Sequence, residues 1–201
     1  MFWRLGAAYA YTYTTLKFND SGTIDYVDMK KLALEVFLER RLGERLTGSF
    51  GIGASLAGHL YTLGSTYEIL PGPVVSAALS YRVLDGRRAA PFVLVGGSLG
   101  ASALGTRQIG SQDSETMYAF DGRVSATVGK TIAGIVSPYL AARGFGLPVL
   151  WNIQGRDVTG SDKYHYQVGA GVSVRLGEAD LLAEWMPFGE GAVVVGAGMA
   201  F

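Results

Sequence analysis

The chain has 201 residues, of which 49% are hydrophobic and 17% are charged, and its 17 basic residues balance its 17 acidic residues. A formal net charge of zero gives no basic excess for binding nucleic acid, so we expect no such partner. The sequence has no cysteine, which excludes disulfides and thiolate chemistry, and no run of 18 apolar residues, which excludes a transmembrane helix.

Alternation of apolar residues with polar or small ones predicts β-strands in the first half of the chain, because successive side chains of a strand point to opposite faces. In the first strand Tyr11 lies on the apolar face and Arg4 on the other. In the third strand the same alternation places Leu60 on the apolar face and His59 opposite it. The strands predicted here are residues 3–17, 30–42, 46–60, 73–84 and 91–103.

The second half of the chain continues the pattern to its last residue. Residues 164–176 follow it most regularly, with Tyr166 and Val168 opposed to Gln167. The final strand ends on Phe201, an apolar terminus that indicates a non-aqueous surrounding rather than a frayed end in water. The strands predicted here are residues 117–128, 135–145, 164–176, 181–188 and 192–201.

Short and long connections alternate between these strands. The second and eighth strands are followed by "LGER" and "GEAD", whereas the first and seventh are followed by "FNDSGTIDYVDM" and "PVLWNIQGRDVTGSDK". Short turns at one rim and long loops at the other are typical of membrane-spanning barrels. We therefore predict an all-β fold, a closed antiparallel up-and-down transmembrane β-barrel of ten strands that forms a single domain over residues 1–201. The short "FGEG" after the ninth strand makes a tight hairpin and leaves eight strands as the alternative.

Closure of the sheet follows from the lack of hydrogen-bonding partners in hydrocarbon, so the last strand must pair with the first. The bulky apolar face of each strand then contacts lipid, which is the reverse of a soluble, lipocalin-like barrel. Aromatic side chains on this outer face fall at two heights, which predicts two interfacial girdles. The girdle near the long loops contains Tyr11, Tyr13, Tyr118, Tyr164 and Tyr166, and the girdle near the short turns contains Trp3, Tyr81 and Phe201.

The tyrosine-rich first strand, the rhythm of short turns and long loops, and the final strand ending in Phe201 resemble the small outer-membrane β-barrel proteins of Gram-negative bacteria, the OmpA/OmpX/OmpW-like group. The resemblance implies an outer-membrane location, with the bilayer and lipopolysaccharide as surroundings, and a mature chain that lacks its signal peptide. It also implies that Phe201, Met199 and Val195 form the signal read by the barrel-assembly machinery.

The predicted lumen face carries both signs of charge. An isolated charge in a narrow lumen costs far more free energy than a paired one, so these side chains are expected to form ion pairs. We predict that this network plugs the lumen and that the barrel has a structural or surface-binding role. The excess of arginine supports an alternative, a narrow and weakly anion-preferring pore for small solutes. The network comprises Arg4, Glu35, Glu39, Arg41, Arg82, Asp121, Arg123, Arg143, Arg175 and Glu184.

An enzyme is the less favoured hypothesis. His59 and His165 are predicted on the inner face, where either could act as a general base with Ser55 or Asp162. Their strands, however, lie on opposite sides of a ten-stranded barrel. The paired-aspartate and His–Asp arrangements of the omptin proteases, and the Ser–His signature of the lipid A deacylases, have no match here. The acidic residues of the loops also lack the EF-hand spacing for Ca²⁺. We expect no catalysis, cofactor or metal.

Overall fold

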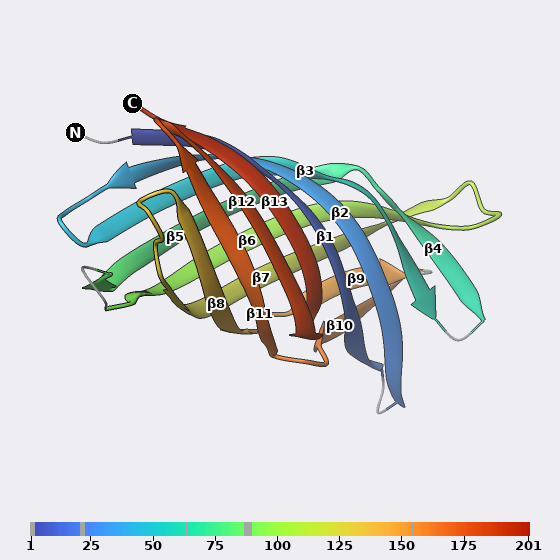
Figure 1. The fold of residues 1–201 in the computed structure, drawn as a ribbon. Helices are drawn as coiled ribbons and strands as arrows, with labels where there is room; N and C mark the ends of the chain where they lie inside the picture. Colours follow the sequence, from blue (N-terminus) through green and yellow to red (C-terminus); the bar gives the residue numbers. More distant parts are fainter. Residues whose placement is uncertain (1–2, 21–22, 63, 87–89, 154) are drawn as a thin grey trace.

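The structure is a computed structural model that describes residues 3–20, 23–62, 64–86, 90–153 and 155–201. These residues form one antiparallel sheet that closes on itself (Figure 1). Among them no helix is long and apolar enough to cross a membrane. The strands are β1 (Trp3–Asp20), β2 (Thr23–Arg41), β3 (Leu46–Thr62), β4 (Ser65–Leu70), β5 (Gly72–Asp85), β6 (Phe92–Gln108), β7 (Ser114–Gly129), β8 (Val136–Phe145), β9 (Val149–Ile153), β10 (Arg156–Asp162), β11 (Tyr166–Leu176), β12 (Ala179–Gly189) and β13 (Gly191–Ala200).

The part of the barrel near the short turns, called the wide half, is a closed ring of ten strands, which confirms the predicted fold. Each predicted strand corresponds to one strand of this ring. Around the ring the hydrogen-bonded order is β1, β2, β3, β5, β6, β7, β8, β11, β12, β13 and back to β1.

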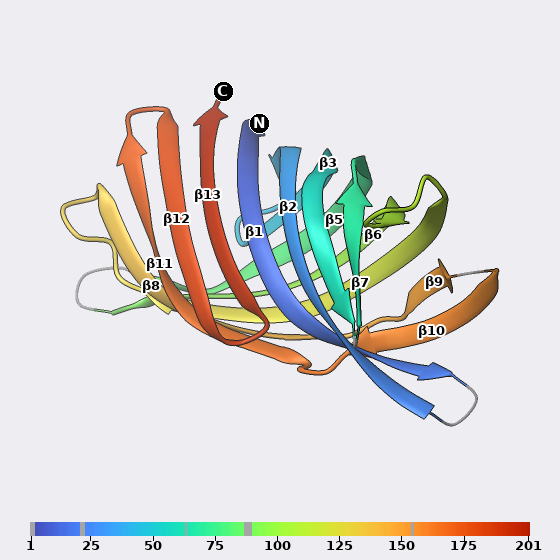
Figure 2. The same ribbon diagram turned by 90° about the vertical axis from the view of Figure 1, so that its right-hand side faces the viewer.

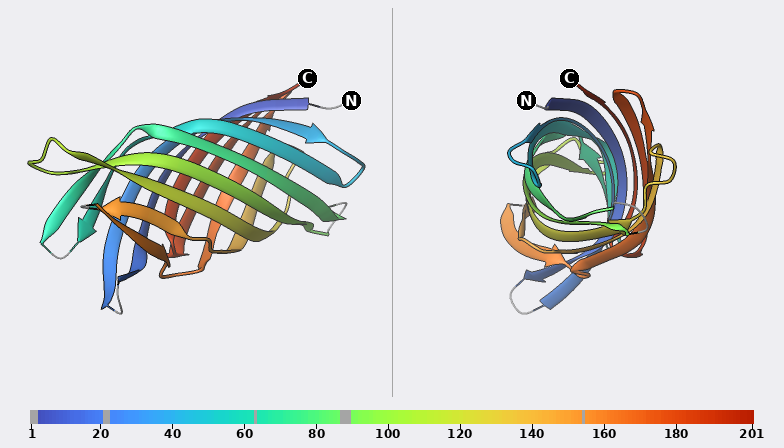
Figure 3. Two further views of the ribbon diagram at one scale, coloured as in Figure 1. Left: turned by 180° about the vertical axis from the view of Figure 1, so that it is seen from behind. Right: turned by 60° about the vertical axis from the view of Figure 1, so that its left-hand side comes forward.

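The part near the long connections, called the narrow half, is a ring of eight strands. The β12–β13 hairpin turns at Glu190, where Gly189 has the positive φ of 83° that a tight turn requires. Beyond this turn β10 takes the place of β13 beside β1, from Leu16↔Asp162 to Asn19↔Thr159. The predicted number of ten strands therefore holds for the wide half, whereas the eight strands of the narrow half include β4, β9 and β10, which the sequence did not predict as strands. Figures 2 and 3 show how the barrel tapers from one half to the other. Around the narrow ring the order is β1, β2, β3, β4, β6, β7, β9, β10 and back to β1.

The extent of the predicted long loops is wrong, because most of these segments are strands of the narrow half. β1 continues to Asp20 and β2 begins at Thr23, and β4, β9 and β10 all lie in stretches predicted as loops. Their alternation is present in the sequence, but its apolar residues now point inward, as Phe18 and Val27 do. The narrow ring thus has its apolar residues inside, as a soluble barrel does.

A bulge in β3 corrects the predicted position of His59. The β2–β3 register shifts between Leu32 and Ala33, which leaves Leu56 as an extra residue in β3. Because side chains alternate with a period of two, one extra residue exchanges the two faces of the strand beyond it. Leu60 is consequently buried inside, whereas His59 is exposed on the outer wall.

The seam of the barrel joins the two ends of the chain, as predicted. β13 pairs with β1 over ten positions, from Arg4↔Ala200 to Tyr13↔Gly191. At the rim the Phe201 amide donates to the Trp3 carbonyl at 2.9 Å, and the Trp3 amide donates back to Phe201 at 3.1 Å. The two strands lie side by side in Figure 2, with the start of β1 and the end of β13 at the same rim.

Candidate functional site

The interior of the narrow half is packed with apolar side chains, which the predicted charged plug did not anticipate. Twelve buried residues from eight strands meet there, and they leave little room for water. The alternating apolar residues of the supposed loops were the sequence signal for this cluster. Its members are Leu16, Phe18, Val27, Met29, Leu60, Tyr67, Ile69, Leu104, Met117, Val149, Trp151 and Val158.

Trp151 of β9 contacts aromatic rings from two other strands in this apolar cluster. Its ring centroid lies 5.6 Å from that of Phe18 and 5.1 Å from that of Tyr67, and the Tyr67 contact is edge to face. The indole Nε1 donates a hydrogen bond of 2.9 Å to Thr106 Oγ1, so its one polar atom is satisfied without water. Trp151 therefore connects β9 with β1, β4 and β6, none of which is paired with β9 in the narrow ring.

Charged side chains are collected in the wide half, beginning directly below the apolar cluster. Arg123 donates from Nε to both carboxylate oxygens of Asp121, at 2.8 and 2.7 Å, and lies 3.7 Å from a carboxylate oxygen of Glu190. The Gln167 side-chain oxygen accepts from both Arg123 and Arg143 at 3.4 Å. Gln167 thus connects two arginines that the sequence could only place on the same face.

Glu184 and Arg143 form the most buried pair of the lumen. Arg143 donates to Glu184 Oε1 at 2.6 Å, and the Tyr139 hydroxyl donates to Glu184 Oε2 at 3.1 Å. Glu184 is only 7% exposed. Both oxygens of this carboxylate are therefore used inside the barrel wall.

A further group of ion pairs, centred on Arg4, lies near the short-turn rim. Arg4 donates from Nε to Asp180 at 2.8 Å and from a terminal nitrogen to Glu39 at 3.1 Å. Its guanidinium also lies 5.2 Å from the centroid of the Phe37 ring. Glu35, farther inside, accepts a hydrogen bond of 2.5 Å from the Ser76 hydroxyl. Asp180 was missed because the sequence places it in the "GEAD" turn.

Three arginines predicted in the network lie outside it. Arg41, Arg82 and Arg175 are exposed at the short-turn rim, where water solvates them, and Arg41 donates to the Glu44 carbonyl at 3.0 Å. These side chains end their strands at the rim, so alternation alone could not tell a lumen position from a solvated one.

A cavity of about 270 Å³ lies between the apolar cluster and the ion pairs. Leu16 and Met29 line its apolar side, and Lys31, Glu35, Asp121, Arg123, Asp162 and Glu190 supply charged groups. Lys31, Asp162 and Glu190 were not in the predicted network. Glu190 was unpredictable as a lumen residue because it lies in the "FGEG" turn, which the structure buries at the level where the ring changes from ten strands to eight.

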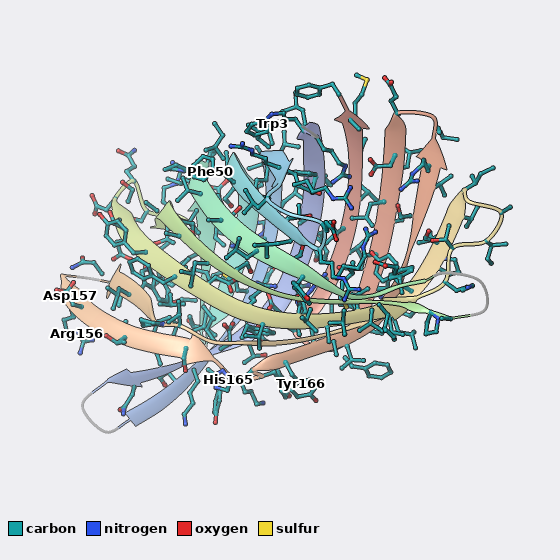
Figure 4. All side chains as sticks on the ribbon, turned by 90° about the vertical axis from the view of Figure 1, so that its left-hand side faces the viewer. Trp3, Phe50, Arg156, Asp157, His165 and Tyr166 are labelled. Carbon is teal, nitrogen blue, oxygen red and sulfur yellow. The ribbon has the colours of Figure 1, made fainter. Side chains whose placement is uncertain are left out.

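The hypothetical catalytic groups are not brought together. Ser55 is buried inside and donates weakly to the Leu32 carbonyl at 3.4 Å, whereas His59 lies on the outer wall. Asp162 accepts from Thr14 at 3.3 Å, and His165 is exposed in the connection between β10 and β11 (Figure 4). Within the described residues no group of three or more His, Asp and Glu side chains is arranged to hold a metal.

The residues of the two predicted girdles lie on the outer wall. Tyr11, Tyr13, Tyr118, Tyr164 and Tyr166 are all exposed there, as are Tyr81 and Phe201 near the short turns. Trp3 is partly covered by Arg40, whose guanidinium lies 5.0 Å from the indole centroid. Figure 4 shows Trp3 and the Arg156–Asp157 hairpin tip at opposite ends of the barrel.

Comparisons with known proteins identify the fold. No protein-family model and no curated protein sequence matches the chain. Among solved structures, the Escherichia coli outer membrane protease OmpT is similar over 100% of this chain and 97% of its own, with a TM-score of 0.56 and 8% identity. The translocator domain of the autotransporter NalP from Neisseria meningitidis is similar over 100% and 89%, with a TM-score of 0.53 and 13% identity. For the outer membrane protein OprG of Pseudomonas aeruginosa the shares are 100% and 95%, with a TM-score of 0.51 and 9% identity. The chain therefore has the fold of the outer-membrane β-barrel proteins of Gram-negative bacteria.

Proposed function

We propose that this chain is an integral outer-membrane β-barrel whose lumen is closed to solutes and whose role is structural or surface-binding. The observation that carries this proposal is the opposite distribution of apolar residues in the two halves. They cover the outside of the wide half and fill the inside of the narrow half.

The outer wall supports the membrane location. Large apolar side chains protrude from it on adjacent strands, including Leu99 at 66% and Val124 at 68% exposure. An open apolar surface also extends across this wall from Phe50 and Leu79 to Leu99 and Val124. Soluble monomers rarely expose apolar surface this continuous, whereas a barrel in lipid requires it.

The apolar cluster supports the closed lumen. A hydrated ion would have to displace Trp151 and its neighbours or lose its water, and either step is costly. On this proposal the wide half, which is lined by small residues such as Ser98 and Gly100, is a cup open toward the short-turn rim. The narrow pore considered from the sequence would require a conformation in which this cluster is open.

Two measurements test the proposal. After refolding in detergent, a closed barrel resists SDS until boiled, so unheated and heated samples should migrate differently on a gel. In planar lipid bilayers the refolded protein should give no channel steps, while a Phe18→Ala, Trp151→Ala double variant that refolds should be leakier. Identical migration would disprove the barrel in its folded form, and stable single-channel steps from the wild type would disprove the closed lumen.

A further inference from the structure

Three of the five lysines of the chain lie together on one side of the outer wall, at the long-loop end. Lys17 of β1 pairs in register with Tyr26 of β2 and with Ser161 of β10. The Lys163 amide bonds to the Thr15 carbonyl of β1, and its ammonium extends to 5.1 Å from the Tyr26 ring. Tyr26 is therefore flanked by two lysines.

The third lysine continues this surface onto β2 and β3. Lys30 lies opposite His59 in the β2–β3 register, with its ammonium 5.5 Å from the Tyr61 ring. His59 stacks on the same ring at 6.0 Å, because the bulge in β3 turns both side chains outward. We call Lys17, Lys30 and Lys163 the lysine patch.

The patch carries a surplus of positive charge. Asp28 lies on the same face of β2, between Tyr26 and Lys30, and its carboxylate accepts a hydrogen bond of 2.7 Å from Thr15. The three lysines of the patch therefore outnumber this neighbouring carboxylate. Glu68, opposite His59 on β4, is engaged by Arg107 at 2.8 Å. All three lysine side chains are exposed and available to an external anion.

The height of the patch indicates which anion it meets. Along β2 the outward residues change from Val36 and Leu34, which are apolar, to Lys30, and then to Tyr26 beside Lys17. Lys163 directly precedes the girdle residue Tyr164, whose ring lies 5.1 Å from its ammonium. In a membrane this sequence of surfaces corresponds to hydrocarbon, interface and headgroups.

We propose that the lysine patch binds the phosphate groups of an anionic glycolipid of the outer leaflet, the lipid A part of lipopolysaccharide. This inference rests on the proposed membrane location, which places the long-loop rim in that leaflet. Clustered lysines at a membrane surface attract anionic headgroups, each as a mobile point charge suited to phosphate. The tyrosines between them present flat apolar faces to the sugar and the upper acyl chains. The apolar wall below the patch contacts the rest of the lipid's acyl chains.

The test compares two triple variants of equal charge change. The patch variant combines Lys17→Gln, Lys30→Gln and Lys163→Gln, and the control combines Arg41→Gln, Arg82→Gln and Arg175→Gln at the opposite rim. Each refolded protein is titrated in detergent micelles with bisphosphorylated lipid A and with its dephosphorylated form. We expect the patch variant to bind bisphosphorylated lipid A about tenfold more weakly or worse, since each lysine contributes to anionic lipid binding. The control should bind like the wild type, and dephosphorylated lipid should not distinguish the three proteins.

Each result has a defined meaning. Wild-type affinity in the patch variant, or equal weakening in the arginine control, would overturn the site. Competition by inorganic phosphate alone would identify a free-anion site and overturn the lipid assignment. If unheated and heated wild-type protein migrated alike on the gel, the result would instead count against the proposed barrel itself. The gel therefore separates the failure of the proposed function from the failure of this inference.

Discussion

At the scale of single residues, burial decides how much each lumen charge stabilises the barrel. Glu184 is 7% exposed and both of its oxygens accept hydrogen bonds, whereas the Asp121 side chain is 38% exposed to the water of the wide half. Removing one partner of a buried pair leaves an uncompensated charge, and water compensates an exposed one. Glu184 and Asp121 are therefore not equivalent, although the sequence predicts both simply as lumen acids.

Glu184→Gln should accordingly lower the free energy of unfolding by about 3 kcal/mol, because Arg143 would be left without its carboxylate inside the wall. Asp121→Asn should cost about 1 kcal/mol or less because of its exposure. Urea unfolding midpoints of protein refolded in detergent measure both, with the rim variant Arg175→Gln as a control that should leave the midpoint unchanged. Equal losses for the two acidic variants would show that burial does not rank these pairs.

At the scale of elements, the ten strands of the wide half could be predicted because each shows one bulky apolar face to lipid. The strands β4, β9 and β10 could not, since their apolar residues point inward and are separated by polar residues that read as loops. Val149 and Trp151 do stand two residues apart in the sequence, so the period of a strand could be seen. The sequence did not show whether the apolar face points into the barrel or out of it. That depends on whether lipid or water surrounds the strand.

The position of His59 shows a second limit at this scale. One inserted residue at Leu56 reverses every later side chain of β3, and nothing in the local composition marks the bulge. The ion pairs depend on register in the same way. Arg4 and Glu39 face each other across β1 and β2, but Asp180 meets them only because the barrel closes. Pairing partners thus follow from the closed fold rather than from spacing along the chain.

The stability of the narrow half depends on aromatic packing across its ring, and this can be tested by removing Trp151. Trp151→Ala should lower the free energy of unfolding by about 3–5 kcal/mol, mainly the cost of a large cavity, because Thr106 would lose the indole donor but keep its hydrogen bond to the Glu115 carbonyl. Ile109→Ala, at an exposed position just beyond β6, should change it by less than about 0.5 kcal/mol. Denaturant unfolding of the two refolded variants would measure both changes. A small effect of Trp151→Ala would mean that the narrow half frays independently of the wide half.

At the scale of the whole molecule, the change from ten strands to eight separates two environments in one sheet. The wide ring has room for solvated charges and presents its apolar side outward. The narrow ring has too little interior for water and has its apolar side inward. The transition occurs where the β12–β13 hairpin ends, with Glu190 turned into the cavity at that level. A short "FGEG" turn in the sequence thereby sets the shape of the barrel.

The last residue belongs to this scale because it closes the ring. The Phe201 backbone forms two hydrogen bonds with Trp3, while its ring is 69% exposed on the outer wall and contributes little to internal packing. Phe201→Ala keeps the backbone bonds and all ten paired positions of the seam, so the unfolding midpoint of refolded protein should change little. If assembly machinery reads the terminal aromatic residue, the amount inserted into outer membranes of cells should nevertheless fall several-fold.

Val194→Thr, on the inner face of β13, is the control and should leave both quantities unchanged. Quantifying heat-modifiable protein in isolated membranes beside detergent unfolding separates the two effects. Wild-type insertion of Phe201→Ala would remove the recognition role while leaving the closed seam intact.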